Sequence, residues 1–264
     1  MTAVSAPAAA AGPLRHVEHV MGTVFSFVVR DAGPGVPAGL AAAVARLHQL
    51  DAEFSTYRPD SPISRLGRGE VTLDECRPEI AEVLARCEEV AGQTDGWFSA
   101  YPGGVLDPSG WVKGWAIDEA SRILTEAGSG HHCVSGGGDV QTAGESAPGR
   151  GWRIGVADPV RAGELATVVL GRGVCVATSG VAERGAHIID PHSGKPAEGL
   201  LSVTLVSGLD RIALTDAWAT AVFAMGPVLG LEWAERRDGV EAMAVLSDGI
   251  QVRTSGFSRF SRVP

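Results

Sequence analysis

Two oxygen-bearing side chains interrupt a long apolar segment in the last quarter of the chain. Asp216 and Thr220 stand four residues apart in TDAWATAVFAMG, so on a helix they share one face. A carboxylate and a hydroxyl are ligands that Mg²⁺ selects, usually together with substrate phosphates. Alternatively, Asp216 or Thr215 caps the start of the helix, and Thr220 bonds back to a carbonyl. On this segment alone the capping interpretation is preferred.

A second polar group lies in VLDPSGWVKGWAIDEA. Asp107 and Gly110 precede Lys113, a lysine between two tryptophans just ahead of a helical pattern. Lys113 either extends out of an apolar surface towards water or contacts an anion at the start of that helix, where free amides favour phosphate.

Three consecutive glycines precede Asp139 in VSGGGDVQTAG. The segment lacks the G-x-G-x-x-G spacing of dinucleotide-binding folds and the G-K-[ST] of a P-loop, so neither is indicated. The glycines form either a tight turn or a stretch of bare amides that approaches a flat or anionic ligand. In the second case Asp139 fixes the loop or bonds a ligand hydroxyl.

A histidine candidate for proton transfer lies in ATSGVAERGAHIIDPHSGKP. His187 stands beside a glycine-rich turn and shortly before Asp190, which makes it a candidate base. Ser179, His187 and Asp190 are not interpreted as a hydrolase triad, because the G-x-S-x-G elbow is absent.

The composition excludes several classes of partner. The 264 residues are 45% hydrophobic, enough for one large domain or two small ones. The formal net charge is −9 and lysines and arginines form no cluster, which argues against nucleic-acid binding. The four cysteines show no metal-ligand spacing and are interpreted as buried thiols.

The N-terminal segment is rich in alanine and proline and lacks the basic and apolar regions of a signal peptide. Residues 1–14 are therefore expected to be a flexible leader, with a single catalytic domain over 15–264. No window approaches the roughly 20 apolar residues of a membrane span, so a cytoplasmic location is expected.

Hydrophobic periodicity predicts the elements that must position these residues. Helical spacing predicts helices beginning near Pro37, over 78–92 and 113–128, and a last pair over 214–226 and 227–237. Strand patterns cover about 20–30, with the glycine of MGT inside the strand, and then 131–144, 152–158, 166–180, 186–191, 200–207, 240–247 and 251–257. The pattern lacks regular βαβ alternation, which favours an α+β fold of mixed or antiparallel sheets packed with helices.

Five motifs in this order resemble the ApbE family of FAD:protein FMN transferases: HVMGTVFSF, DPSGWVKGWAIDEA, VSGGGDVQTAG, VATSGVAERGAHIIDPHSGKP and LTDAWATAVFAMG. Together they extend over nearly all of the chain after the leader. The resemblance implies the fold of that family, Mg²⁺ as cofactor and FAD as substrate.

The resemblance also implies a role for each matching position. Asp216, Thr220 and the backbone carbonyl of Gly110 match metal ligands, which favours the magnesium interpretation over capping. His187 or Asp190 would accept the proton of an acceptor hydroxyl. The side chains implied to contact FAD are Met21, Trp97, Phe98, Asp107, Lys113, Asp139, Ile188 and Ile189.

The implied reaction is Mg²⁺-dependent transfer of FMN from FAD to a Thr or Ser hydroxyl of an acceptor flavoprotein, with release of AMP. The expected acceptor carries a Ser/Thr-Gly-Ala-Thr-like motif. The alternatives are hydrolysis of FAD to FMN and AMP by the same site, and a flavin-binding protein without catalysis.

Overall fold

A long antiparallel sheet forms the frame of the molecule. The computed structural model describes residues 12–182, 185–208 and 211–262. Within these residues the main sheet has eight strands, and all neighbouring strands run antiparallel. In order across the sheet they are β1 (Leu14–Val20), β2 (Thr23–Val29), β3 (His132–Gly136), β4 (Asp139–Ala143), β7 (Cys175–Gly180), β8 (Leu200–Ser207), β9 (Val240–Leu246) and β10 (Gln251–Arg253).

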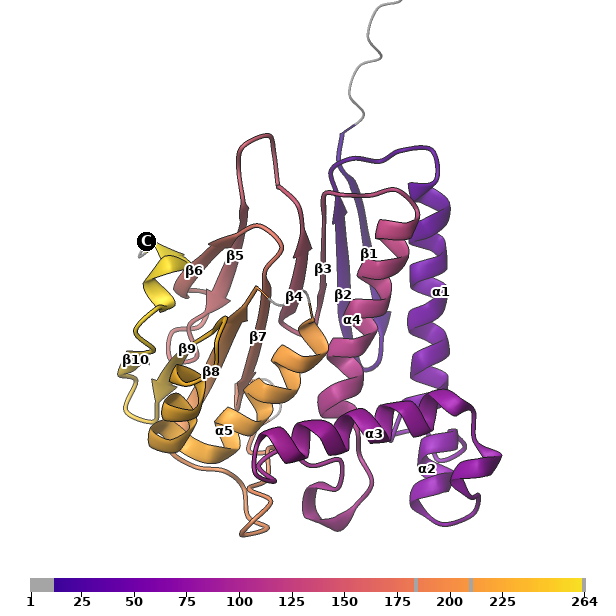
Figure 1. The fold of residues 1–264 in the computed structure, drawn as a ribbon, viewed down its shortest axis with the longest axis vertical. Coiled ribbons are helices and arrows are strands. Elements are labelled where there is room, and N and C mark those ends of the chain that lie inside the picture. The colour runs from indigo at the N-terminus through magenta and orange to yellow at the C-terminus, as the bar shows by residue number, and fades with distance from the viewer. Residues whose placement is uncertain (1–11, 183–184, 209–210, 263–264) are drawn as a thin grey trace, which may run out of the picture.

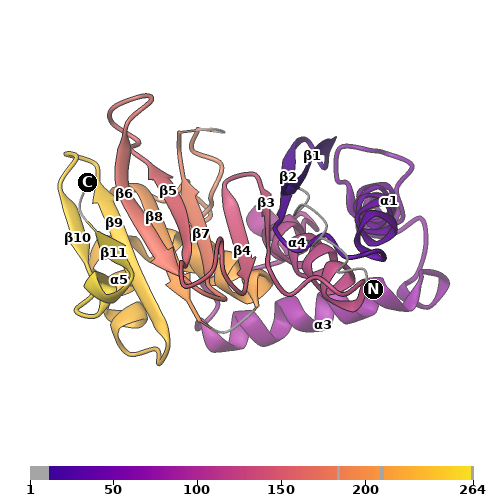
Figure 2. The same ribbon diagram turned by 90° about the horizontal axis from the view of Figure 1, so that it is seen from above.

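A second, three-stranded sheet packs on one half of the main sheet. Its order is β11 (Ser261–Arg262), β6 (Leu165–Gly171) and β5 (Trp152–Ala157). Side chains from both sheets, among them Ile154, Val169, Val206 and Met243, form a shared apolar core. Figure 2 shows this small sheet on one side of the main sheet and helices on the other.

The helical layer and the main sheet enclose the larger core. Phe25 and Phe27 of β2, Leu47 of the first helix and Ile117 of the fourth are each at most 1% exposed. The fourth helix packs against the first and the fifth, as Figure 1 shows. The helices are α1 (Val36–Phe54), α2 (Pro62–Gly67), α3 (Pro78–Gln93), α4 (Ser109–Glu126) and α5 (Ile212–Glu235), with short 3₁₀ turns η1 (Leu73–Glu75), η2 (Pro102–Gly104) and η3 (Phe257–Arg259).

The α+β prediction is confirmed, but the first predicted strand is wrong in its detail. The segment about 20–30 is not one strand with an internal glycine. Strands β1 and β2 form a hairpin, and Met21 and Gly22 are its two-residue turn, with φ of 56° and 67°. Two successive positive φ values are the geometry that gives a hairpin turn the right-handed twist of its strands.

The expectation that no segment is apolar enough for a membrane span is wrong: among the described residues, helix α5 alone is long and apolar enough to cross a membrane. Of its most apolar window, 72% is buried inside the protein, as in a core helix. Both predicted helices are present within α5, and Gly226, with φ 76° and ψ −176°, separates them immediately before Pro227, at the predicted boundary.

Three further expectations differ from the structure. The segment 186–191 is a loop with a single bridge between Ile189 and Pro196 instead of a strand, because Asp190 begins a tight turn there. Helix α4 begins at Ser109, not at Lys113, and the short helix α2 was not predicted. Residues 1–11 of the expected leader lie outside the described residues.

Candidate functional site

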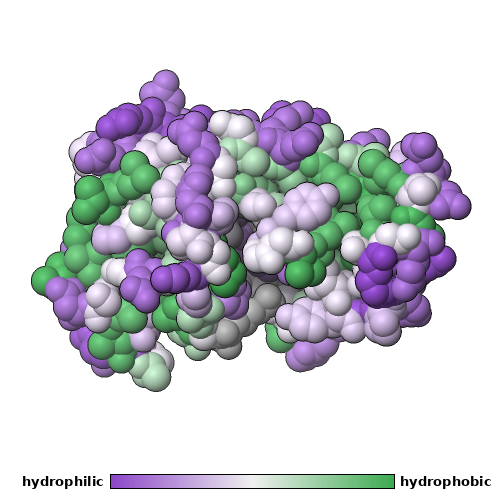
Figure 3. Space-filling view, turned by 90° about the horizontal axis from the view of Figure 1, so that it is seen from below, coloured by the Kyte–Doolittle hydropathy of each residue, from purple (hydrophilic) through white to green (hydrophobic). Residues whose placement is uncertain are grey.

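A cavity of about 370 Å³ lies where the two sheets meet the first turns of α4 and the middle of α5. Its lining includes Gly110 and Lys113 of α4, Asp216 and Thr220 of α5, and Gly155 of β5. The surface is hollowed near its centre in the view from below (Figure 3). The cavity therefore collects polar side chains from segments that are far apart in the sequence.

A close crossing of α4 and α5 positions the polar side chains at the base of the cavity. A Cβ at Gly114 would lie 2.6 Å from the Cα of Ala213, so only glycine allows this approach. The Gly114 N–H donates to Oδ2 of Asp216 at 3.1 Å. The crossing therefore fixes the position of the Asp216 carboxylate.

The capping interpretation of Asp216 is wrong. Helix α5 begins at Ile212, so Asp216 lies in its second turn. The first amides of α5 are satisfied from α4 instead, because the Asp118 carboxylate accepts from Ile212 N at 3.0 Å and from Ala213 N at 3.1 Å. The Asp216 carboxylate is 3% exposed and lies at the cavity.

Lys113 lies between two buried carboxylates, and the interpretation that it extends towards water is wrong. Its Nζ lies 3.0 Å from Oδ2 of Asp216 and also forms an ion pair with Asp139. Asp139 is fully buried, and its other oxygen accepts from the Thr178 N–H at 3.0 Å. Two carboxylates and one ammonium leave this cluster with a net charge of about −1, which attracts a further cation.

Oxygen donors suitable for Mg²⁺ lie beside this cluster. Thr220 Oγ1 lies 3.4 Å from Ser179 Oγ, and a Cβ at Gly110 would be 3.9 Å from the same Thr220 oxygen. The first turn of α4 and the middle of α5 thus face each other, one helical turn away from the contact between Gly114 and the Asp216 carboxylate. Hard oxygen donors with a single carboxylate fit Mg²⁺, which commonly completes its coordination with water and phosphate. The described residues include no group of three or more His, Cys, Asp and Glu side chains that could hold a metal.

His187 lies in the cavity wall and is exposed to solvent. Its Nδ1 lies 3.0 Å from the carbonyl oxygen of Gly185, which can only accept, so Nδ1 carries the proton and Nε2 is the basic nitrogen. Asp190 instead holds the next turn, where its carboxylate accepts from His192 N and Ser193 Oγ. The Ser193 hydroxyl, followed by the turn amides, lowers the pKa of Asp190.

An aromatic and aliphatic wall closes other sides of the cavity. Trp97 packs edge-on against His192 with ring centroids 4.4 Å apart. Asp107 accepts from Ser109 N at 3.0 Å, immediately before α4. The other members of this wall include Phe98, Ile188 and Ile189.

Most of the predicted site residues come together in this cavity. Ten line it: Trp97, Phe98, Asp107, Gly110, Lys113, His187, Ile188, Ile189, Asp216 and Thr220. Asp139 lies directly behind Lys113, Asp190 lies in the adjoining turn, and Met21 lies in the β1–β2 turn; these three are not among the described lining residues. Sequence reasoning missed the contribution of β5, although its alternating pattern WRIGVAD identified it as a strand.

Comparison with known proteins gives one family. The family model described as ApbE family matches residues 21–105 and 99–244. The chain is 38% identical over 136 residues to the FAD:protein FMN transferase of Rhodobacter capsulatus, covering 48% of this chain and 25% of that protein. It is 30% identical over 159 residues to the FAD:protein FMN transferase of Escherichia coli K12, covering 56% and 44%. The chain thus spans between a quarter and about half of the length of these relatives.

Solved structures share the fold. The flavin transferase ApbE from Vibrio cholerae superposes with a TM-score of 0.80 at 21% identity, covering 94% of this chain and 99% of that chain. The ApbE protein from Thermotoga maritima gives a TM-score of 0.83 at 23% identity, covering 95% and 100%. The arrangement of helices and sheets around the cavity is therefore that of known flavin transferase structures.

Proposed function

Because this chain belongs to the ApbE family, we propose that it transfers the FMN part of FAD to a Thr or Ser hydroxyl of an acceptor protein, forming a phosphoester and releasing AMP. The observation that carries the proposal is the cluster of Lys113, Asp139 and Asp216 at the cavity, beside the Thr220 hydroxyl. A fixed ammonium beside oxygen donors for a cation is a combination that suits an anionic pyrophosphate.

The donor set supports a role for Mg²⁺. Asp216, Thr220 and the Gly110 carbonyl would hold the ion, and Mg²⁺ bound there would neutralise charge on the pyrophosphate oxygens. Lys113 adds a compact positive charge next to the same oxygens. The α4–α5 crossing keeps these groups in register before FAD arrives, so little reorganisation is needed during the reaction.

The chemical step joins an acceptor hydroxyl oxygen to the FMN phosphorus. The bond between that phosphorus and the oxygen bridging to AMP breaks, and AMP leaves with the bonding electron pair. Nε2 of His187 accepts the hydroxyl proton, and the bond between Nδ1 and Gly185 O keeps the ring in the required tautomer. Asp190 holds the turn that follows His187 and is the alternative base.

The substrate wall supports FAD as the donor. Trp97 and Phe98 offer aromatic surface for a flat ring, and Ile188 and Ile189 offer aliphatic surface on the loop that carries His187. We assign Asp107 to ligand contact at the start of α4, and Met21 to packing on the flavin from the β1–β2 turn. The acceptor's Ser/Thr-Gly-Ala-Thr-like motif and a cytoplasmic location belong to the same proposal.

One assay tests the function. The protein is incubated with FAD, Mg²⁺ and an acceptor protein carrying a Ser/Thr-Gly-Ala-Thr segment, and the acceptor's intact mass and free AMP are measured. An acceptor that gains the mass of FMN, with AMP in equal amount, is the expected result. AMP without a modified acceptor would identify a hydrolase, and neither product would leave a flavin-binding protein.

Two variants test the assigned roles. Asp216→Ala should abolish the Mg²⁺-dependent reaction, whereas Asp74→Ala, an exposed carboxylate on η1, is the matched control and should keep it. His187→Ala should lose about 10²–10⁴-fold in rate, the usual contribution of a general base. Full activity of Asp216→Ala would disprove the metal assignment, and full activity of His187→Ala would transfer the role of base to Asp190.

A further inference from the structure

Strand β5 is an edge strand of the smaller sheet, and its free edge can be identified from the register. β5 pairs only with β6 among the described strands, with Ile154 opposite Val169 and Arg153 opposite Leu170. The Leu170 N–H donates to Phe260 O at 2.7 Å, on the side of β6 away from β5. The Leu170 N–H therefore points away from β5. In an antiparallel ladder this makes Leu170 and Arg153 a non-hydrogen-bonded pair, in which neither backbone bonds to the other.

Hydrogen-bonded and non-hydrogen-bonded pairs alternate along the ladder, so Gly155, two residues after Arg153, also belongs to a non-hydrogen-bonded pair. The backbone N–H and C=O groups of Arg153 and Gly155 therefore point away from β6. Within the described part of the chain neither backbone forms a hydrogen bond outside the strand ladders, and both residues are exposed. Ile154 and Val156, between and after them, are only 8% and 5% exposed and anchor the strand on the core. Proteins usually protect such an edge with proline, lysine or a covering segment, because it can pair with another strand.

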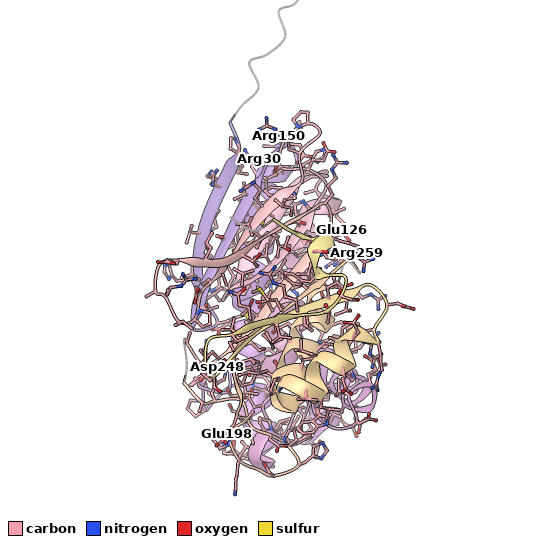
Figure 4. All side chains as sticks on the ribbon, turned by 90° about the vertical axis from the view of Figure 1, so that its left-hand side faces the viewer. Arg30, Glu126, Arg150, Glu198, Asp248 and Arg259 are labelled. Atoms are coloured by element: carbon pink, nitrogen blue, oxygen red, sulfur yellow. The ribbon has the colours of Figure 1, made fainter. Side chains whose placement is uncertain are left out.

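The free edge continues directly into the candidate active site. Ile154, Gly155, Val156 and Ala157 line the same cavity as Lys113 and Asp216. Figure 4 views the side of the small sheet: Arg30 and Arg150 lie at the end where β5 begins, and Glu198 lies at the opposite end. We propose that an extended segment of the acceptor protein adds to β5 as an extra strand, pairing with Arg153 and Gly155, and thereby delivers its Ser or Thr side chain into the cavity. This inference rests on the proposed transferase function.

The chemistry of the edge favours a peptide over the nucleotide. Each non-bonded residue offers one N–H donor and one C=O acceptor in the strand plane, which matches the alternating groups of another backbone. A phosphate would meet the carbonyl oxygens as well as the amides, and like charges would repel. On the added strand alternate side chains point to opposite faces, so one register turns the reacting hydroxyl towards the cavity.

The protein-side test is Gly155→Pro, which removes the N–H at the free edge and leaves the β5–β6 bonds intact. Binding of a fluorescein-labelled acceptor peptide to the FAD-loaded protein is measured by anisotropy, and FAD binding by quenching of flavin fluorescence. Loss of one backbone bond together with the added bulk should weaken peptide binding by about fivefold or more. Gly155→Ala keeps the N–H and should bind the peptide more tightly than Gly155→Pro does. Its added Cβ meets only the flexible end of Leu165, at 2.9 Å.

The ligand-side test leaves the protein unchanged. Two peptides are made with N-methyl groups on alternate amides, one in each register, and both are assayed for binding and for FMN transfer. One register should bind about fivefold or more weakly than the unmethylated peptide, and the other should bind nearly as well. This two-residue asymmetry is expected only when one edge of an extended segment is paired.

Each remaining outcome has a single meaning. Equal effects of both methylated registers, or wild-type protein that binds no peptide, would overturn the inference. A parallel loss of FAD binding in Gly155→Pro would assign the edge to the nucleotide. If the wild-type protein forms a dimer that Gly155→Pro dissociates, the edge pairs with a second copy and the inference also fails. Peptide that binds with register asymmetry but gains no FMN would refute the proposed transfer and support the β5 edge as a peptide site.

Discussion

The contact between α4 and α5 at Gly114 allows a sharp prediction about how the site is held together. In Gly114→Ala the new methyl group would lie 2.6 Å from the Cα of Ala213 and 3.0 Å from the Cβ of Asp216. Both of these atoms belong to the opposing helix, and a backbone atom cannot rotate out of the way. The two helices must therefore move apart.

The size of the effect follows from these distances. Non-bonded carbons prefer about 3.5–4.0 Å, so the helices would separate by about 1 Å. Overpacking of this kind lowers the free energy of unfolding by about 1–3 kcal/mol. The better helix propensity of alanine offsets about 0.5–1 kcal/mol of this, so the free energy of unfolding falls by at most about 2 kcal/mol. That loss lowers Tm by about 4–8 °C in a chain of this size. A displacement of about 1 Å between Gly110 and Asp216 should also cost about 100-fold in rate.

Thermal unfolding and the FMN-transfer assay measure the two effects separately. Gly92→Ala is the matched control: Gly92 lies on α3, and a Cβ there meets nothing within 4 Å. That control should melt at or slightly above the wild-type temperature and keep its activity. If Gly114→Ala melted and reacted like the wild type, the close helix crossing would not be what positions Asp216.

Three other predictions concern single groups. Asp118→Ala leaves the first amides of α5 without their acceptor and should lower the free energy of unfolding in urea by about 1 kcal/mol; an unchanged midpoint and slope would contradict this. The hydrogen bond from Ser193 lowers the pKa of Asp190 in the folded state. The ionised Asp190 carboxylate therefore stabilises the fold at pH values above the ordinary aspartate pKa, and this stabilisation is lost as the pH falls through the lowered pKa. The difference in Tm between wild type and Asp190→Asn should therefore shrink from pH 6 to pH 3, and a constant difference would refute the linkage. Cys87 is buried, and burial raises the pKa of its thiol to about 12, so iodoacetamide at pH 8 should modify it only after unfolding; rapid labelling of Cys87 in the folded protein would show otherwise.

The sequence predicted best those helices and strands whose apolar residues recur with the period of the helix or strand itself. The apolar positions of α1 and α3 recur at helical spacing, and the predicted helices there match the structure closely. The start of α4 was predicted too late because Asp107, Pro108 and Gly110 are typical turn residues. In the structure the helix already begins at Ser109. The β1–β2 hairpin was missed because methionine seldom adopts positive φ, so HVMGTVFSF reads as one continuous strand.

Long-range proximity was beyond local reasoning. The cluster of Lys113, Asp139 and Asp216 joins α4, the start of β4 and α5, and no spacing within any one segment brings these residues together. The family resemblance grouped them in one site, whereas helix periodicity alone favoured a capping role for Asp216. The free edge of β5 was likewise unpredictable, because the pattern WRIGVAD predicts a strand but not which neighbour that strand lacks.

The resting position of Lys113 connects the fold to the proposed chemistry. Its side chain is 23% exposed, and its ammonium lies against two carboxylates that are at most 5% exposed. Buried carboxylates require compensation, and a single ammonium neutralises only one of the two charges. Asp216 lines the cavity together with Thr220 and with Gly110 of the first turn of α4. Under the proposed function, this excess of carboxylates over ammonium groups would favour a divalent cation bound together with an anionic substrate.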